Sequence, residues 1–418
     1  MTPSARLQAA IEILEALART GRPADRTLRD WFRTRRYAGS KDRAAIGERV
    51  FGTLRRHAAL VWRMRSDNPR ALVIGSLAAE GSDLAQIEAL FDSSKYGPAP
   101  LNESERAMLA SPREETPPLW VQGEFPAFLE TELVRSLGSN LLDEMRAMGG
   151  RAPVDLRVNT LKATRGDVLA ELRAGGFVPE ATPHAPHGIR IKQNDRASQL
   201  SRSRGFLEGR FEFQDEAAQI ASLLAAAKPG ERILDLAAGA GGKALALAAE
   251  MGNRGVIIAR DADAVRLAQL AARAARAGAI IIREDLSAEA SAKADAVLVD
   301  APCSGSGAWR RQPEQKWRLT PERLVELQTI QDQLLDEAAR LAPPRIIYAT
   351  CSLLMCENED RVSGFLARHP EYAIRPAARI WREVTDTPPP PGMGDVFRAT
   401  PLMTGTDGFF VAVLARQW

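Results

Sequence analysis

The chain has 418 residues, of which 45% are hydrophobic, and a formal net charge of +3 at pH 7. This length predicts two or three domains, and the hydrophobic content excludes a disordered or fibrous protein. No run of about 18 apolar residues is present, which argues against a transmembrane helix. Glu12 and Glu15 interrupt the apolar pattern near the start, which therefore predicts an amphipathic helix and no signal peptide.

The chain contains only three cysteines and four histidines. Their spacing matches no zinc site, so we expect no metal. Few cysteines and no secretory signal indicate the reducing cytoplasm, where thiols stay free for chemistry.

Residues 1–145 are predicted to form a helical domain. Apolar residues recur with the helical period in 7–17 and again over the longer run 41–64. Proline, glycine and serine separate the helices at 93–100 and 111–118.

This helical region contains a basic stretch between Arg19 and Arg70. The stretch has fifteen lysines and arginines against five acids, and Trp31, Phe32 and Trp62 lie among them. Arginine mixed with aromatic residues favours phosphate contacts and base stacking, as in RNA binding. The alternative interpretation is a solvated helical face.

Two further domains are predicted after the helices. Residues 146–210 contain a β-rich run at 154–159 and a helix at 165–174, which indicate a small α+β unit. From residue 211 to 418, strands alternate with helices, as in an α/β domain with a mostly parallel sheet. Its predicted strands are 231–239, 254–261, 279–285, 294–302, 345–352 and a final strand within 407–418.

The turn after the first of these strands, "LDLAAGAGGKALAL", is a candidate nucleotide site at a strand's carboxyl end. A P-loop is excluded because Ala237 replaces its first glycine and Ala244 its hydroxyl residue. A dinucleotide site is a weak match, through Gly239, Gly241 and an acid at Asp261.

S-adenosylmethionine explains more of the pattern. Asp235, Asp261 and Asp285 each stand at the end of one of three consecutive predicted strands. Three acids suit a cationic amino-acid end, ribose hydroxyls and an adenine amine, and the glycines allow close backbone approach. The alternative is that each aspartate only caps a helix.

A methyl donor beside thiols narrows the reaction further. C5 of cytosine is a poor nucleophile until a thiolate adds at C6, and a cysteine can both add and leave again. Cys303 in "DAPCSGSG" and Cys351 in "YATCS" follow strands, and Asp300 can hold N3 of the base. Cys356 lies in a helix-like segment and is better explained as a packing residue.

These residues resemble the RsmB/Nop/Sun family of RNA cytosine-5 methyltransferases, in particular its bacterial 16S ribosomal RNA enzymes with an N-terminal NusB-like domain. The resemblance covers nearly the whole chain. The motifs are "DAPCSGSGAWRRQPEQKWR", "YATCSLLMCENED", "RVNTLK", "FEFQDEAAQ", "GTDGFFVAVL" and the NusB-like "GSKDRAAIGERVFGTLRR".

The resemblance implies a Rossmann-like class I methyltransferase domain with a seven-stranded sheet at 211–418. It also implies a NusB-like RNA-binding domain at 1–145 and an RRM-like unit at 146–210. It makes Cys351 the nucleophile, Cys303 the cysteine that releases product and Asp300 the acid near N3. The implied cofactor-binding residues are Ala237, Ala238, Gly239, Ala240, Gly241, Gly242, Lys243, Asp261, Asp285 and Asp300.

The chain departs from the family in two places. Ala237 lacks a thiol common in the family, and Gly239-Ala240 replaces alanine–proline, from which we expect a looser loop and weaker cofactor binding. Met355 and Cys356 replace a common proline and glutamate. Because the family often lacks a cysteine at this position, we expect Cys356 to have no catalytic role.

We therefore expect a monomeric cytoplasmic enzyme, without membrane contact, that methylates C5 of a cytidine in 16S ribosomal RNA or a small-subunit assembly intermediate. One alternative is an RNA-binding assembly factor whose active site has decayed, which the retained cysteines and acids disfavour. Another is a DNA cytosine-5 methyltransferase. In that class the cysteine of the proline–cysteine motif, here Cys303, would be the nucleophile. The absence of a sizeable target-recognition insertion disfavours it.

Overall fold

The computed structural model describes residues 1–111, 113–191, 197–284 and 293–417. The chain forms two compact units, Met1–Gly150 with Trp309–Thr320, and Arg151–Ala308 with Pro321–Trp418. The sequence-based division at residues 145 and 210 does not foresee that Trp309–Thr320 belongs with the first unit.

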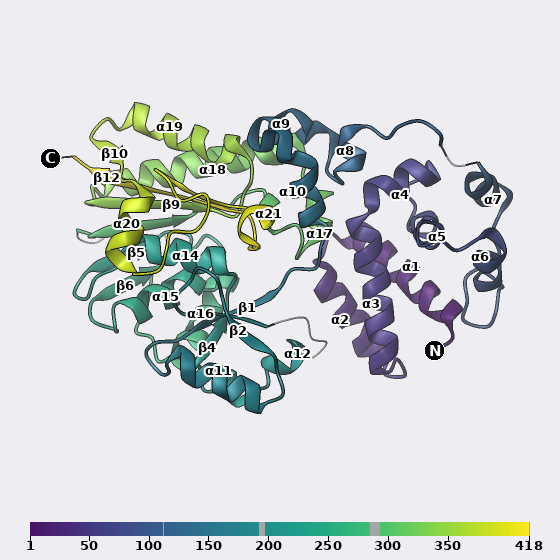
Figure 1. Ribbon diagram of the computed structural model, residues 1–418, viewed down its shortest axis with the longest axis horizontal. Helices are drawn as coiled ribbons and strands as arrows, with labels where there is room; N and C mark the ends of the chain where they lie inside the picture. The colour runs from purple at the N-terminus through teal and green to yellow at the C-terminus, as the bar shows by residue number, and fades with distance from the viewer. Residues whose placement is uncertain (112, 192–196, 285–292, 418) are drawn as a thin grey trace. The chain divides into compact units, whose positions relative to one another are not determined.

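The first unit is helical in the part that the structure describes (Figure 1). No helix among the described residues combines the length and apolar character needed to cross a bilayer. The helices are α1 (Pro3–Thr20), α2 (Ala24–Thr34), α3 (Ser40–Arg55), α4 (His57–Met64), α5 (Pro69–Ala79), α6 (Leu84–Leu90), α7 (Glu103–Ala110), α8 (Leu119–Gln122), η1 (Ala127–Leu129), α9 (Glu130–Leu137), η2 (Gly138–Asn140), α10 (Leu141–Met148) and α17 (Pro313–Lys316).

Helix α1 shows how the sequence starts and stops these elements. The Thr2 side chain accepts the Ala5 N–H, Pro3 occupies the first helical position, and Gly21 ends the helix in the left-handed region. One face of α1 is buried with residues of α3 and α5, including Ile13, Ile46 and Val73.

The second unit begins with a four-stranded antiparallel sheet in the order β2-β3-β1-β4. Its elements are β1 (Val154–Val158), α11 (Arg165–Ala174), β2 (Pro179–Ala181), β3 (Gly188–Ile191), α12 (Ala197–Leu200), α13 (Arg204–Leu207) and β4 (Phe211–Phe213). Because Phe211 pairs with Val158, the last strand of this sheet lies beyond the predicted boundary at residue 210.

The larger sheet has seven strands in the order β10-β12-β9-β8-β5-β6-β7, and an eighth, β11, pairs with β12. Only β12 runs against its neighbours on this path, so the predicted mostly parallel seven-stranded Rossmann-like fold is confirmed. The strands are β5 (Arg232–Asp235), β6 (Val256–Ala259), β7 (Ile282–Arg283), β8 (Ala296–Asp300), β9 (Arg345–Thr350), β10 (Tyr372–Ile374), β11 (Phe397–Ala399) and β12 (Phe409–Arg416).

Helices cover both faces of this sheet, which explains its nearly continuous apolar strands (Figure 1). Successive residues of β5 enter opposite layers. Ile233 packs with α14, α15 and α20, and Leu234 packs with α18 and α19. The helices are α14 (Glu216–Leu224), α15 (Gly242–Glu250), α16 (Ala264–Ala277), η3 (Ser306–Ala308), α18 (Pro321–Arg340), η4 (Met355–Glu357), α19 (Glu359–Arg368), α20 (Ala377–Val384) and α21 (Pro401–Thr404).

Asn159, from the "RVNTLK" motif, fastens the small sheet to α16. Its buried side-chain amide donates to the Gly209 carbonyl at 2.8 Å and to the Ala277 carbonyl at 2.7 Å. Gly209 must be glycine because its φ is +71° and a Cβ would lie 2.0 Å from the Arg276 carbonyl oxygen. The small sheet is therefore held on the larger α/β layer by polar contacts of fixed geometry.

Replacing Asn159 with alanine is expected to destabilise the second unit by about 1–3 kcal/mol, because two buried carbonyls lose their donor. The midpoint of thermal unfolding should fall by several degrees, as measured by calorimetry. Asn140→Ala, at an exposed position, is the matched control and should change the stability by less than about 0.5 kcal/mol. Equal midpoints for the two variants would contradict the assignment.

Candidate active site

The site lies at the carboxyl ends of β5, β6, β8 and β9, where ligands bind in sheets of this kind. Each strand delivers one of the residues singled out in the sequence. Asp235 and Asp300 end β5 and β8, Cys351 follows β9 directly, and Asp261 lies two residues beyond β6. Asp285 lies outside the described residues.

The loop between β5 and α15 brings its backbone towards this edge. Gly239 and Gly241 have φ of +55° and +82°, and a Cβ on Gly241 would lie 2.1 Å from Leu270. The loop is tied down by an N–H donated from Gly239 to the Asp261 carboxylate at 2.6 Å and by a bond from Arg273 to the Ala240 carbonyl at 2.7 Å. Two hydrogen bonds thus hold this loop, and the expectation that it is looser than in the family and binds the cofactor more weakly stays a prediction.

Asp235 is a fully buried carboxylate with only partial compensation, because the Lys243 charge and the Ala237 backbone lower its pKa by less than burial raises it. Neither side-chain oxygen makes a hydrogen bond of normal geometry with the described residues. Burial, together with the nearby charge of Asp300, raises the pKa of Asp235 to about 8. A buried unpaired carboxylate is costly unless a cation or donor meets it. The site therefore suits a ligand with a positive amino group, as S-adenosylmethionine has.

Lys243 ties the glycine loop to Asp300. Its ammonium lies 2.6 Å from Asp300 Oδ2 and 4.9 Å from the centre of the Phe409 ring. Lys243 is buried, whereas the Asp300 side chain keeps about a third of its surface exposed. Asp300 is thus held from the protein side and open on the other, as a residue that contacts a substrate base must be.

Cys303 and Cys351 come together although 48 positions separate them, with their sulfur atoms 3.4 Å apart. Both are free and half-buried. The hydrogen bond with Cys351 and burial raise the pKa of Cys303 well above its ordinary value. Cys303 is therefore a thiol at neutral pH and can donate its S–H to the Cys351 sulfur. Cys356 lies in η4, outside this thiol pair.

Gly408, the second glycine of the "GTDGFF" motif, contacts the turn that follows Cys303. Gly307 donates its N–H to the Cys351 carbonyl at 2.9 Å and accepts the Gly408 N–H at 2.8 Å. A Cβ on Gly307 would lie 2.1 Å from the Gly408 carbonyl oxygen. Three segments far apart in sequence therefore meet without side chains between them.

Glu357 is a candidate positioning residue that the sequence pattern did not indicate. It is fully buried and accepts the Ser304 N–H, the Ser304 and Ser352 hydroxyls and the side-chain amide of Gln331. Ser304 follows Cys303 and Ser352 follows Cys351, so one carboxylate fastens both cysteine turns. Its sequence gives little signal, because Glu357 is followed by two further acids in "LLMCENED", and Gln331 lies in a helix among other polar residues.

Two family models match this chain. The family model of the 16S rRNA methyltransferase RsmB/F matches residues 222–415, and that of the RsmF/B-like ferredoxin-like domain matches residues 125–197.

Two relatives illustrate the similarity in sequence. A probable ribosomal RNA small subunit methyltransferase B from Synechocystis is 30% identical over 80% of this chain and 77% of its own length. Ribosomal RNA small subunit methyltransferase F from Serratia proteamaculans is 31% identical over 70% of this chain, which spans 63% of that relative.

Solved structures share the fold. The crystal structure of PH0851 matches with a TM-score of 0.76 at 26% identity, over 100% of this chain and 99% of that one. A methyltransferase homologue from Pyrococcus horikoshii matches with a TM-score of 0.59 at 25% identity, over 72% of this chain and 97% of its own. The chain therefore belongs to the RsmB/F family of 16S rRNA methyltransferases, and its cofactor is S-adenosylmethionine.

Proposed function

We propose that this protein methylates C5 of a cytidine in 16S ribosomal RNA through a covalent bond between Cys351 and C6 of the base. The observation that carries the proposal is the thiol pair at 3.4 Å, set at the carboxyl ends of β8 and β9 next to Asp300. RNA methylation itself follows from the family; the base, the atom and the covalent route are the proposal.

Cys351 acts as the nucleophile. Its thiolate forms a bond to C6, and the electron pair displaced from the C5–C6 double bond makes C5 nucleophilic. The raised pKa of Cys303 supports this assignment, because a protonated Cys303 stabilises a Cys351 thiolate by donating its S–H. Once C5 carries the methyl group, loss of the C5 proton and cleavage of the S–C6 bond restore the ring, and Cys303 serves this release.

Asp300 accepts a hydrogen bond from a protonated N3, and the positive charge of that N3–H is neutralised by the electron density that moves onto the ring as the thiolate adds. The bond from Lys243 fixes the Asp300 side chain while leaving it partly exposed. S-adenosylmethionine, when bound, supplies an electrophilic methyl group. Asp235 would receive its amino group, and the backbone of Ala237–Lys243 with Asp261 would line the rest of the cofactor site; Asp285 keeps its predicted role there.

The helical region 1–145 and the α+β region 146–210 would bind and position the RNA. We propose that the enzyme works as a monomer in the cytoplasm, where ribosomal RNA is assembled into subunits. The basic stretch Arg19–Arg70 supports RNA binding by the helical region.

The two cysteines should give opposite phenotypes. With RNA containing 5-fluorocytidine, Cys351→Ala is expected to abolish the covalent adduct seen with the wild type on a denaturing gel. With ordinary RNA, Cys303→Ala is expected to accumulate an adduct and to lower multiple turnover on the order of a hundredfold, because release fails. Cys356→Ala is the control and should behave as wild type in both assays.

Three outcomes would contradict the proposal. Loss of the adduct only in Cys303→Ala would reverse the two roles and support the DNA-enzyme arrangement. Absence of methyl transfer to any RNA of its host would support a decayed assembly factor. The third outcome is an unchanged bisulfite map of ribosomal RNA in a strain that lacks the protein. Loss of methylation at one cytidine in that map would instead identify the target.

Asp235→Asn is expected to affect cofactor binding and stability in opposite directions. Binding of S-adenosylmethionine should weaken about ten- to a hundredfold, measured by calorimetry, because the charged hydrogen bond is lost. The folded-state pKa of about 8 lies above the ordinary 3.8. The folded protein therefore binds more protons than the unfolded chain, and Asp235 removes stability as pH rises from about 4 to about 8.

The Asp235→Asn variant should consequently unfold at a higher temperature than the wild type at pH 8, without cofactor, and the difference should shrink towards pH 4. The exposed Asp395→Asn is the matched control and should change neither property. Unchanged cofactor affinity in Asp235→Asn would mean that this carboxylate orders the loop instead of meeting the ligand.

Glu357→Gln should uncouple the two cysteine turns. A neutral amide cannot accept all four hydrogen bonds, so we expect single-turnover methylation to slow by about tenfold or more at saturating RNA, with the KM for RNA little changed. The control is Glu326→Gln on α18, whose side chain is 59% exposed. A higher KM with an unchanged rate would exclude a positioning role.

A further inference from the structure

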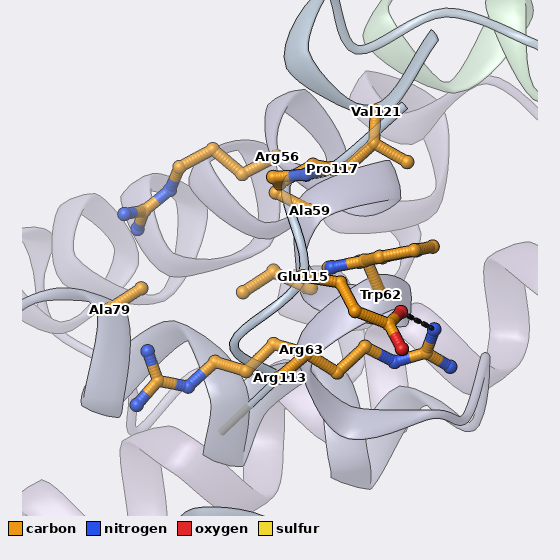
Figure 2. A pocket seen from close by; sticks show the side chains of 10 residues that line it. Arg56, Ala59, Trp62, Arg63, Ala79, Arg113, Glu115, Pro117 and Val121 are labelled. Carbon is orange, nitrogen blue, oxygen red and sulfur yellow. Dashed lines mark ion pairs between the residues drawn. The ribbon is translucent and has the colours of Figure 1, made fainter. Parts of the chain in front are cut away.

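The helical unit contains a pocket that the proposed catalytic chemistry does not use. It has a volume of about 280 Å³ and lies between α4, α5 and the segment 113–121 (Figure 2). Leu60 and Val121 give it a buried apolar floor, and Trp62 forms a wall. A volume at the lower end of ligand sites suits one small planar group.

The aromatic wall is already paired with a cation. The Arg113 guanidinium lies over the Trp62 ring, 4.1 Å from its centre. Figure 2 shows this arrangement and the ion pair at 3.9 Å that joins Arg113 to Glu115. Glu115 is exposed and its contact is long, so it leaves much of the Arg113 charge available.

Two further arginines, Arg56 and Arg63, line the pocket. Arg56 is engaged by Glu80 at 2.7 Å. Among the described residues, the Nε atoms of Arg63 and Arg113 are buried and have no hydrogen-bond partner. Because these Nε atoms are buried, a ligand in the pocket would meet the two guanidiniums through their terminal nitrogens. The pocket thus offers an apolar floor, an aromatic face and the guanidinium groups of Arg63 and Arg113.

We propose that this pocket binds a single unpaired nucleotide of the RNA, with its base against Trp62 and its phosphate on Arg63. Aromatic and guanidinium planes stack on splayed-out bases, and arginine forks match phosphate oxygens. The basic stretch Arg19–Arg70, which includes Trp62 and Arg63, favours RNA over a protein partner. This inference rests on the proposed function and adds to it a contact away from the reacting base.

Photocrosslinking tests the site directly. The full-length protein is irradiated with a single-stranded oligonucleotide of its 16S RNA carrying 5-bromouridine, and the crosslinked peptide is identified by mass spectrometry. We expect a crosslink at Trp62 that unlabelled single-stranded RNA removes by competition and duplex RNA does not. Because this assay needs no methyl transfer, it can succeed even if the cytosine-5 chemistry is wrong.

Binding measurements separate stacking from charge. Trp62→Leu should weaken binding of the oligonucleotide about tenfold without changing the salt dependence, because it removes an aromatic ring and no charge. Arg63→Ala should weaken binding and reduce the slope of log Kd against log salt by about one, because one phosphate contact is lost. Matched controls outside the basic stretch are Phe128→Leu and Arg146→Ala, both at exposed side chains.

The proposal is overturned if crosslinks fall only outside the pocket, or if Trp62→Leu and Arg63→Ala bind RNA as the wild type does. Such a result would leave the pocket to another ligand, such as a protein partner. Thermal unfolding of each variant shows whether it is folded. If Trp62→Leu is unfolded, the binding of Arg63→Ala alone decides the outcome. If the RNA crosslinks at Trp62 and binds as expected but no cytidine is methylated, the proposed function is contradicted and the nucleotide-binding pocket is still supported.

Discussion

The active site depends on the buried carboxylate of Glu357. A fully buried charge is tolerated only when several donors surround it, and here the donors come from both cysteine turns and from α18. Its requirement for partners fixes Ser304 and Ser352, and with them the neighbouring thiols 3.4 Å apart. The same charge contributes to the raised pKa of Cys303. Glu357 therefore fixes the geometry of the two cysteine turns and adds to the raised pKa of Cys303, whose main causes are the hydrogen bond with Cys351 and burial.

Asp235 shows the opposite solution to the same physical problem. Its carboxylate is as deeply buried as that of Glu357 but has no hydrogen bond of normal geometry among the described residues, and burial together with the Asp300 charge raises its pKa to about 8. The two carboxylates therefore have different roles at the candidate site. Glu357 is satisfied by the protein and makes the site rigid, whereas Asp235 keeps its bonding capacity for a cationic ligand.

The helical unit illustrates why a count of charges predicts a binding surface only coarsely. Several arginines of the basic stretch are engaged by acids from outside it, as Arg35 is by Glu12, Arg56 by Glu80 and Arg70 by Glu105. Such pairs leave fewer cations for phosphate than the sequence suggests. Arg63 differs because its buried Nε has no partner among the described residues.

Much of the architecture followed from local pattern. Apolar β-branched runs predicted β5, β6, β8, β9 and β12, and placed Asp235, Asp300 and Cys351 at strand ends. These predictions succeeded because strand period and turn residues are properties of neighbouring positions. β4 was assigned to the wrong side of a boundary, because strand pairing joins distant segments and leaves no local signal.

The sequence by itself determined the fold class and the family, and it suggested a chemistry for two cysteines and a set of acids that stays a proposal. Only the tertiary structure decided that Gln331 and Glu357 lie together at the candidate site, that Asp235 has no hydrogen bond of normal geometry among the described residues, and that Trp309–Thr320 joins the helical unit. The physical reason is that burial and hydrogen-bond satisfaction depend on what surrounds a side chain in space. Those surroundings come from segments far apart along the chain.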